Sequence, residues 1–215
     1  MVRLDIFSDP ICPWCYIGKA YLDRALETRP DHPFVISWHP FQLNPGMPRE
    51  GADRRAYLEA RFGGRAQAVA AYAQVQAAAE AAGVEIDFEK MERIPNTLDA
   101  HRLIHWAGIE GRQAAMVATL FRGYFREGLD IGNPGVLADL AARVGMDAAA
   151  VARLLATDAD AEDIRARDLD AREKGVQAVP TYLVDLRYVI PGAQPVDLWQ
   201  RVIDEITTLQ AGDGA

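Results

Sequence analysis

The stretch Cys12-Pro13-Trp14-Cys15 contains the only two cysteines of this 215-residue chain. It follows an alternating apolar segment, Val2 to Phe7, and precedes residues with a helical period. If Cys12 is the N-cap, Pro13 fits the first helical position, where its missing N–H costs nothing. The unpaired N–H groups of that first turn favour a thiolate at Cys12, whose sulfur we expect to be exposed. Cys15 follows one turn later on the same face, inside the protein and close enough to form a disulfide.

A Cys-x-x-Cys pair can also be half of a zinc site, which needs four ligands. The chain has no third cysteine, and only His101 and His105 are spaced by one helical turn. The motif therefore favours a redox dithiol over a metal site or an inert buried pair. We predict no bound metal.

Composition narrows the classes of partner. The chain has 31 acidic and 23 basic residues, a net charge of −8, which disfavours nucleic acid as a partner. No apolar run approaches the roughly 20 residues of a membrane span, so no membrane partner is expected. The sequence leads directly into a strand pattern without a leader segment, so we expect a cytoplasmic protein. In that compartment a Cys-x-x-Cys pair is more often catalytic than structural.

The hydrophobic periodicity predicts an α/β protein. A strand over 2–7, a helix after the cysteines and a strand over 34–38 form an opening βαβ unit. About seven helices follow, at 53–62, 65–82, 96–107, 117–125, 137–144, 147–156 and 158–174. Asn96 is the expected N-cap of the third. Strands over 179–184 and 187–190 and a final helix complete the chain. This order predicts a thioredoxin fold (βαβ…ββα) at 1–44 and 176–215, with a large inserted all-helical domain at 45–175.

Several separate motifs agree with one family in order and spacing: Ser8 to Gly18, Pro40 to Pro45, Asn96-Thr97 with Ala100-His101-Arg102, Val179-Pro180-Thr181, and Gly192 to Pro195. Over almost its whole length the sequence resembles the FrnE-like branch of the DsbA family. The resemblance implies a thioredoxin fold with a helical insertion and thiol–disulfide oxidoreductase activity. It also implies that Cys12 is the nucleophile, that Cys15 resolves, and that the bond before Pro180 is cis.

Five further residues are predicted to bind substrate: Pro13, Trp14, Val179, Pro180 and His101. A proline that starts an edge strand leaves neighbouring backbone groups free to pair with a peptide beside the dithiol. His101 is a candidate for lining the site. Asp9 is assigned to the Ser8-Asp9-Pro10 turn and receives no catalytic role, because a charge beside Cys12 would oppose thiolate formation.

We therefore predict a thiol–disulfide oxidoreductase in which Cys12 forms a mixed disulfide with substrate and Cys15 resolves it. Its partners are protein or small-molecule thiols and disulfides. Glutathione is a candidate reductant or ligand, no other cofactor is expected, and the protein is a monomer or a homodimer. Trp14 stands where DsbA-like oxidants usually have His, so strong oxidising power is not implied.

Two other functions stay open at this point. The family's relatives include glutathione-dependent 2-hydroxychromene-2-carboxylate isomerases and kappa-class glutathione transferases. Those enzymes usually carry Ser at the position of Cys12. The second alternative is a redox-linked chaperone whose helices hold client proteins.

Overall fold

The opening βαβ unit is present in the computed structural model, which describes residues 1–212. It consists of β1 (Val2–Ser8), α1 (Pro13–Glu27) and β2 (Phe34–Pro40), and β2 runs parallel to β1. The chain closes with β5 (Thr181–Val184), β6 (Tyr188–Pro191) and α9 (Val196–Gly212). The predicted βαβ…ββα order is therefore confirmed.

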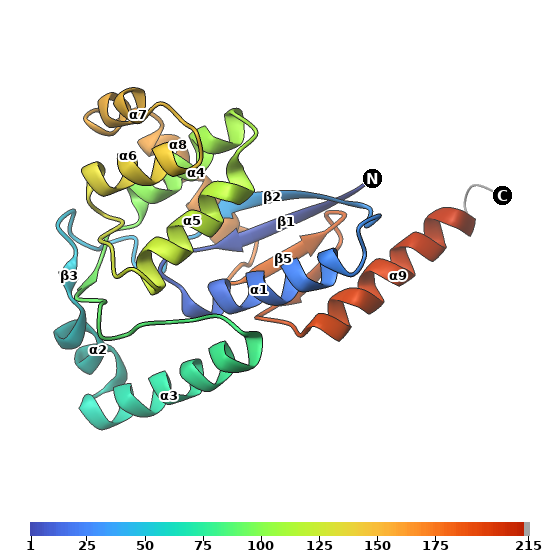
Figure 1. The fold of residues 1–215 in the computed structure, drawn as a ribbon, viewed down its shortest axis with the longest axis horizontal. Coiled ribbons are helices and arrows are strands. Elements are labelled where there is room, and N and C mark those ends of the chain that lie inside the picture. Colours follow the sequence, from blue (N-terminus) through green and yellow to red (C-terminus); the bar gives the residue numbers. More distant parts are fainter. Residues whose placement is uncertain (213–215) are drawn as a thin grey trace.

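These strands form one mixed sheet in the order β2-β1-β5-β6, with β1 in its interior. β1 pairs in parallel with β2 and antiparallel with β5. Leu4 and Ile6 on β1 are completely buried. Helices α1 and α9 lie together along one side of the sheet (Figure 1). Tyr182 of β5 meets Trp199 of α9 edge-to-face, with ring centroids 4.7 Å apart, which fastens α9 to the sheet.

Seven helices lie between β2 and β5, as the periodicity predicts: α2 (Arg54–Phe62), α3 (Arg65–Ala82), α4 (Leu98–Ile109), α5 (Gln113–Phe125), α6 (Pro134–Arg143), α7 (Ala148–Leu155) and α8 (Ala161–Glu173). Two short strands, β3 (Ala52–Asp53) and β4 (Arg93–Ile94), pair antiparallel. Sequence analysis missed them because two residues are too few to show a period.

The N-cap of α4 differs from the prediction by one residue, since it is Thr97. Asn96 still serves the start of this helix. Its side-chain oxygen accepts a hydrogen bond from the Leu98 backbone N–H at 2.9 Å.

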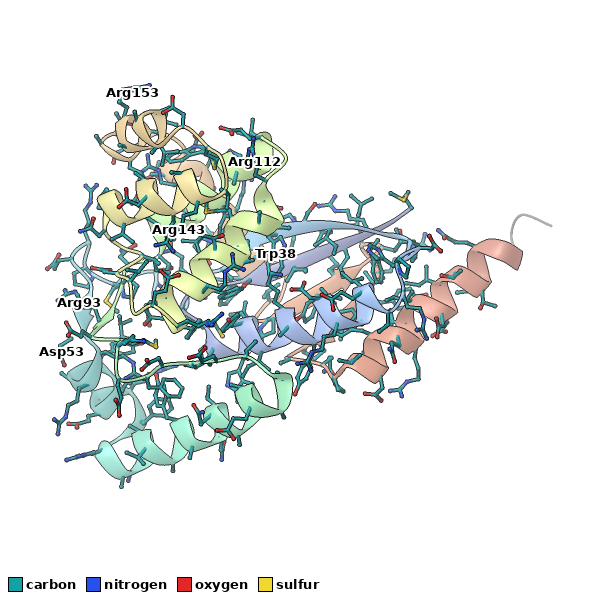
Figure 2. All side chains as sticks on the ribbon, in the orientation of Figure 1. Trp38, Asp53, Arg93, Arg112, Arg143 and Arg153 are labelled. Carbon is teal, nitrogen blue, oxygen red and sulfur yellow. The ribbon has the colours of Figure 1, made fainter. Side chains whose placement is uncertain are left out.

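The helices pack directly against the sheet and α1. Tyr16 of α1 stacks on Phe121 and Phe125 of α5, with ring centroids 5.3 and 5.4 Å apart. At the other end of α5, the Gln113 side-chain oxygen accepts a hydrogen bond from the Trp38 backbone N–H, and its amide N–H donates to the Trp38 carbonyl. Figure 2 labels Trp38, which belongs to β2. One cluster of buried hydrophobic residues includes side chains from both parts of the chain. The division of the chain into a thioredoxin-like domain (1–44 and 176–215) and an inserted helical domain (45–175) stays a prediction.

The structure also bears on membrane association. Within residues 1–212, no helix has the length and apolar character that crossing a membrane requires.

Candidate active site

The two cysteines lie at the start of α1, where the chain turns out of β1. The Asp9 carbonyl accepts a hydrogen bond from the Cys12 N–H at 2.9 Å, which closes the turn. Cys12 is the N-cap with an extended backbone, and Pro13 opens the helix. Its rigid φ and missing N–H suit that position. The predicted local geometry is therefore confirmed, and both cysteines are free thiols.

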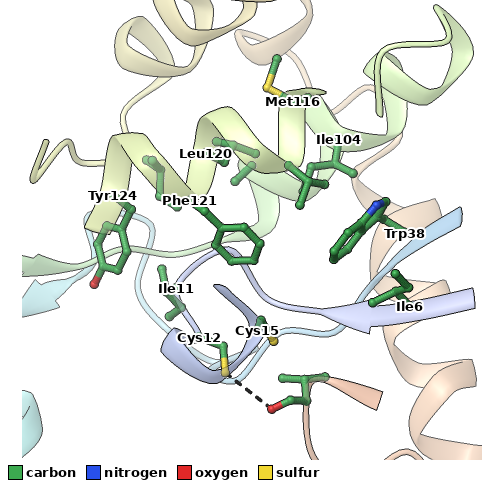
Figure 3. Close-up of a cluster of buried hydrophobic side chains, with 14 of the residues drawn as sticks. Ile6, Ile11, Cys12, Cys15, Trp38, Ile104, Met116, Leu120, Phe121 and Tyr124 are labelled. Atoms are coloured by element: carbon green, nitrogen blue, oxygen red, sulfur yellow. Dashed lines mark hydrogen bonds between the residues drawn. The ribbon is translucent and has the colours of Figure 1, made fainter. Parts of the chain in front are cut away.

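The Cys12 sulfur is more covered than the sequence suggests. Only 4% of the residue is exposed, so the prediction of an exposed Cys12 sulfur is wrong for this structure. The reason is tertiary, because the loop before β5 lies against the start of α1. Cys12 Sγ donates a hydrogen bond to the Val179 carbonyl oxygen at 3.5 Å (Figure 3). The following peptide bond, Val179-Pro180, is cis.

Cys15 is buried one turn further along the helix, with 1% of its surface exposed. Burial raises the pKa of the Cys15 thiol well above its usual range, and the hydrogen bond and charge of Cys12 raise it further. The Ser8 hydroxyl and the Asp9 backbone N–H act in the opposite direction. The buried thiol therefore holds its proton while Cys12 is reduced.

The other predicted substrate-binding residues fall into two groups. Trp14 is 39% exposed and Pro13 is half-buried, so both offer surface beside the dithiol. Val179 and Pro180 are buried, and Val179 contacts Cys12 through its backbone carbonyl. These four residues lie at the dithiol or in the loop that faces it, and their binding role stays a prediction.

His101 is placed differently from the expectation. It is 3% exposed, so a substrate cannot reach it in this structure. Burial lowers the pKa of His101 to about 4, which leaves its ring neutral at pH 7. Its Nε2 atom lies 3.9 Å from Asp9 Oδ1.

Asp9 is the residue whose importance the sequence analysis missed. Its side chain is completely buried, three residues before Cys12. The carboxylate accepts hydrogen bonds from the backbone N–H groups of Ile11 at 3.3 Å and Leu43 at 2.7 Å. These bonds offset only part of the desolvation, and burial raises the pKa of Asp9 to about 7. With His101 neutral, their 3.9 Å contact is not an ion pair.

Segments far along the chain form the back of this site. Thr97, at the start of α4, places its hydroxyl 3.5 Å from Asp9 Oδ2. Asp168 of α8 accepts hydrogen bonds from the Gln42 backbone N–H at 2.7 Å and from Arg172, and its charge adds to the rise in the pKa of Asp9. In the sequence, only the position of Asp9 three residues before Cys12 points to a role at the site. Its burial cannot be predicted locally, because it depends on segments much later in the chain, such as Thr97 at the start of α4.

The arrangement of the His, Cys, Asp and Glu side chains also bears on metal binding. Among residues 1–212, no group of three or more His, Cys, Asp or Glu side chains is arranged to hold a metal ion.

Comparison with known proteins places the chain among thioredoxin-like proteins. The model of the DSBA-like thioredoxin domain matches residues 3–204. The uncharacterized protein YwbO of Bacillus subtilis is 28% identical over 95% of this chain and 96% of its own. A probable DsbA oxidoreductase from Streptomyces coelicolor has a structure similar to this one at a TM-score of 0.85. It is 31% identical, with 95% of this chain and 89% of that chain covered.

Two more distant structures share the fold. A 2-hydroxychromene-2-carboxylate isomerase matches at a TM-score of 0.74 and 17% identity, over 98% of each chain. The cytosolic disulfide reductase DsbM of Pseudomonas aeruginosa matches at 0.69 and 21% identity, over 96% of this chain and 99% of its own. DsbM has also been solved with glutathione.

Proposed function

The chain belongs to the DSBA-like thioredoxin domain family, and on this premise we propose that it is a thiol–disulfide oxidoreductase working through Cys12 and Cys15. The observation that carries the proposal is the asymmetry between the two sulfurs. Cys12 is the N-cap of α1, where the positive end of the helix dipole favours a thiolate. Cys15 is buried behind it and holds its proton. One sulfur is thus suited to attack and the other to resolution.

The exchange proceeds in two steps. The Cys12 thiolate attacks one sulfur of a disulfide, forms a mixed disulfide and releases the other sulfur as a thiolate. Cys15 then loses its proton and attacks the Cys12 sulfur, which closes the Cys12–Cys15 disulfide and releases the second thiol. The reverse sequence oxidises a dithiol substrate. The chemistry itself needs no metal or nucleotide.

Protein and small-molecule disulfides are the proposed substrates. The exposed Trp14 ring beside Cys12 offers an apolar surface to either class. Glutathione is a candidate reductant or ligand, a proposal supported by the glutathione-bound structure of DsbM. A cytoplasmic location is likewise proposed and is supported by the description of DsbM as cytosolic. The reduction potential would fix the direction of electron flow. A value near −270 mV, as in thioredoxin, indicates a reductant, and one near −120 mV, as in DsbA, an oxidant (both approximate).

A glutathione-dependent isomerase is the second candidate, favoured by the likeness to the 2-hydroxychromene-2-carboxylate isomerase. The presence of both cysteines supports redox chemistry over isomerisation. The isomerase reading predicts turnover of an aromatic substrate that survives the loss of Cys15. A redox-linked chaperone instead predicts suppression of aggregation that survives the loss of either cysteine.

The test compares Cys12→Ser and Cys15→Ser after exposure to oxidised glutathione. Cys15→Ser keeps the attacking sulfur and should accumulate the glutathione adduct, because nothing resolves it. Cys12→Ser keeps only the buried sulfur and should form little adduct. Mass spectrometry and non-reducing gels measure both, and the chain has no other cysteine to confuse the result. Equal adduct levels, or more adduct through Cys15, would overturn the proposed roles.

A further inference from the structure

An open groove of about 310 Å³ lies between α2 and α3, and we call it the α2/α3 groove. Leu58 of α2, Val69 and Tyr72 of α3, and Phe88 of the loop after α3 give it a mostly apolar lining. Val69 is 62% exposed, so this apolar surface is open to solvent. Exposed apolar surface bordered by charged residues often marks a binding site on a soluble protein.

The charged residues that line the α2/α3 groove are three arginines, Arg54, Arg55 and Arg65, and one glutamate, Glu59. Glu59 is paired with Arg55, whose Nε lies 3.2 Å from its Oε1. Within residues 1–212, Arg54 and Arg65 belong to no ion pair. The whole chain has a net charge of −8, so this unpaired positive charge is a local feature of the surface.

Aromatic rings hold Arg54 in place without neutralising its charge. Its guanidinium carbon lies 4.6 Å from the ring centroid of Tyr72 and 5.4 Å from that of Phe88. A cation above a ring face is attracted to it and keeps its charge. Among the described residues, Arg54 Nε is buried without a hydrogen-bond partner. The groove thus presents a fixed guanidinium beside apolar surface, and a carboxylate is a strong partner for a guanidinium.

The α2/α3 groove lies close to the dithiol. α3 packs against α1, the helix that begins at the Cys12 N-cap (Figure 1). The Tyr57 hydroxyl of α2 donates a hydrogen bond to the side-chain oxygen of Asn44, in the loop after β2. Burial is the main cause that raises the pKa of Tyr72, the charge of Arg54 opposes it, and the charge of Cys12 adds to it. Tyr72 therefore lies within the electric field of the attacking sulfur, and a substrate held in the groove can present a disulfide to Cys12.

We propose that the α2/α3 groove docks a segment of the protein substrate in which an acidic side chain lies next to large apolar ones, while Cys12 attacks a disulfide of that substrate. The proposal rests on the proposed oxidoreductase function and names its substrate class. Carboxylates of the segment pair with Arg54 and Arg65, and its apolar side chains cover Leu58 and Val69. The open groove suits one segment of a larger partner, because sites for small molecules bury most of their ligand.

A binding measurement tests the charge and the apolar surface together. The probe is a short, fluorescently labelled peptide without cysteine that alternates glutamate with leucine and phenylalanine. Its matched control has lysine in place of each glutamate. Fluorescence anisotropy with wild-type protein should show that the acidic peptide binds, that added salt weakens the binding, and that the lysine peptide binds less tightly. Binding that favours the lysine peptide, or that does not respond to salt, overturns the proposal.

Two substitutions in the groove should each weaken this binding at least about fivefold: Arg65→Glu reverses a charge, and Val69→Glu places a negative charge on the apolar surface. Both side chains are exposed, so the fold should persist. The matched controls are Arg153→Glu on α7, far from the groove (Figure 1, Figure 2), and Ile109→Glu at the end of α4, where the side chain is 73% exposed. Each control changes the net charge as its counterpart does and should bind like wild type.

Equal weakening in the groove variants and their controls overturns the proposal. A wild-type dimer that Val69→Glu dissociates also overturns it, because a second copy of the chain would then occupy the groove.

A second measurement connects docking to the dithiol. It uses Cys15→Ser protein, in which an adduct on Cys12 is not resolved. Each peptide is joined through a flexible glycine–serine spacer to a cysteine in disulfide linkage with mercaptoethanol, and hydroxyethyl disulfide is the small, neutral reference. Mass spectrometry should show that Cys12 forms adducts at least about fivefold faster with the acidic peptide than with the lysine peptide, because docking raises the local concentration of the disulfide.

Adding Arg65→Glu should remove this advantage and leave the rate with hydroxyethyl disulfide unchanged. An acidic peptide without an advantage, or an advantage that survives Arg65→Glu, overturns the docking proposal. A Cys12 that forms no adduct even with hydroxyethyl disulfide overturns the oxidoreductase proposal instead.

Discussion

Replacing Asp9 with asparagine should change how the stability of the fold depends on pH. The pKa of Asp9 is raised from 3.8 to about 7, so folding favours its protonated form. A carboxyl group of this kind costs nothing below pH of about 4, where it is protonated in both states. Its cost grows as pH rises from about 4 to about 7 and is constant above that. At 1.36 kcal/mol per unit, a shift of about three units amounts to about 4 kcal/mol.

Asparagine has nearly the same shape and no charge, so it removes this cost. It also loses one acceptor, because a single amide oxygen cannot replace both carboxylate oxygens toward Ile11 and Leu43. That loss is worth about 1 kcal/mol. Asp9→Asn should therefore be less stable than wild type by at most about 1 kcal/mol well below pH 4, equal to it near a pH of about 4.5, and more stable by about 3 kcal/mol above pH 7.

Urea unfolding of the reduced proteins between pH of about 4.5 and 8.5 measures the difference, provided the slope m is the same for both. Asp170→Asn, an exposed carboxylate on α8, is the control and should show no comparable trend. A difference between Asp9→Asn and wild type that stays constant with pH would refute the reasoning. A gain in stability would also indicate that wild type keeps a destabilising acid behind its dithiol, as functional sites often do.

Three further outcomes are expected. His101→Asn should be more stable than wild type at pH of about 4.5 by up to about 3 kcal/mol. The pKa of His101 is lowered from 6.5 to about 4, so this gain should vanish as pH rises through 6.5, and urea unfolding at both pH values checks it. Gly18→Ala should destabilise by about 1–2 kcal/mol although alanine favours helices, because the new Cβ would lie 2.5 Å from the hydroxyl of buried Tyr182. Gly46→Ala, whose Cβ would meet nothing within 4 Å, is the control and should be neutral or stabilising when the thermal melts of the two variants are compared. Arg102→Lys should lower the free energy of unfolding by about 3 kcal/mol, measured by chemical denaturation. The buried guanidinium donates hydrogen bonds to Asp99 and to three backbone carbonyls, and one ammonium group cannot satisfy all four. A loss below about 1 kcal/mol would contradict this role.

The sequence by itself determined the features that depend on local chemistry. Hydrophobic period and turn residues located the helices, and α3 begins and ends where the sequence predicts. The spacing of Cys12 and Cys15 and the proline between them determined the helix start and the N-cap. A proline at the first helical position and a cysteine one turn later act through bonds and contacts within a few residues, so they can be predicted without the rest of the fold.

Only the tertiary structure decided how buried each group is and which distant groups meet. Cys12 is covered because the loop at Val179 lies against it, 167 residues away in sequence. Asp9 appears in the sequence as a turn residue and His101 as a residue lining the site. The fold buries both side chains, with Thr97 at the start of α4 against Asp9, and burial moves their pKa values in opposite directions. Desolvation depends on every atom within several ångströms, and for this pair most of those atoms come from segments far along the chain.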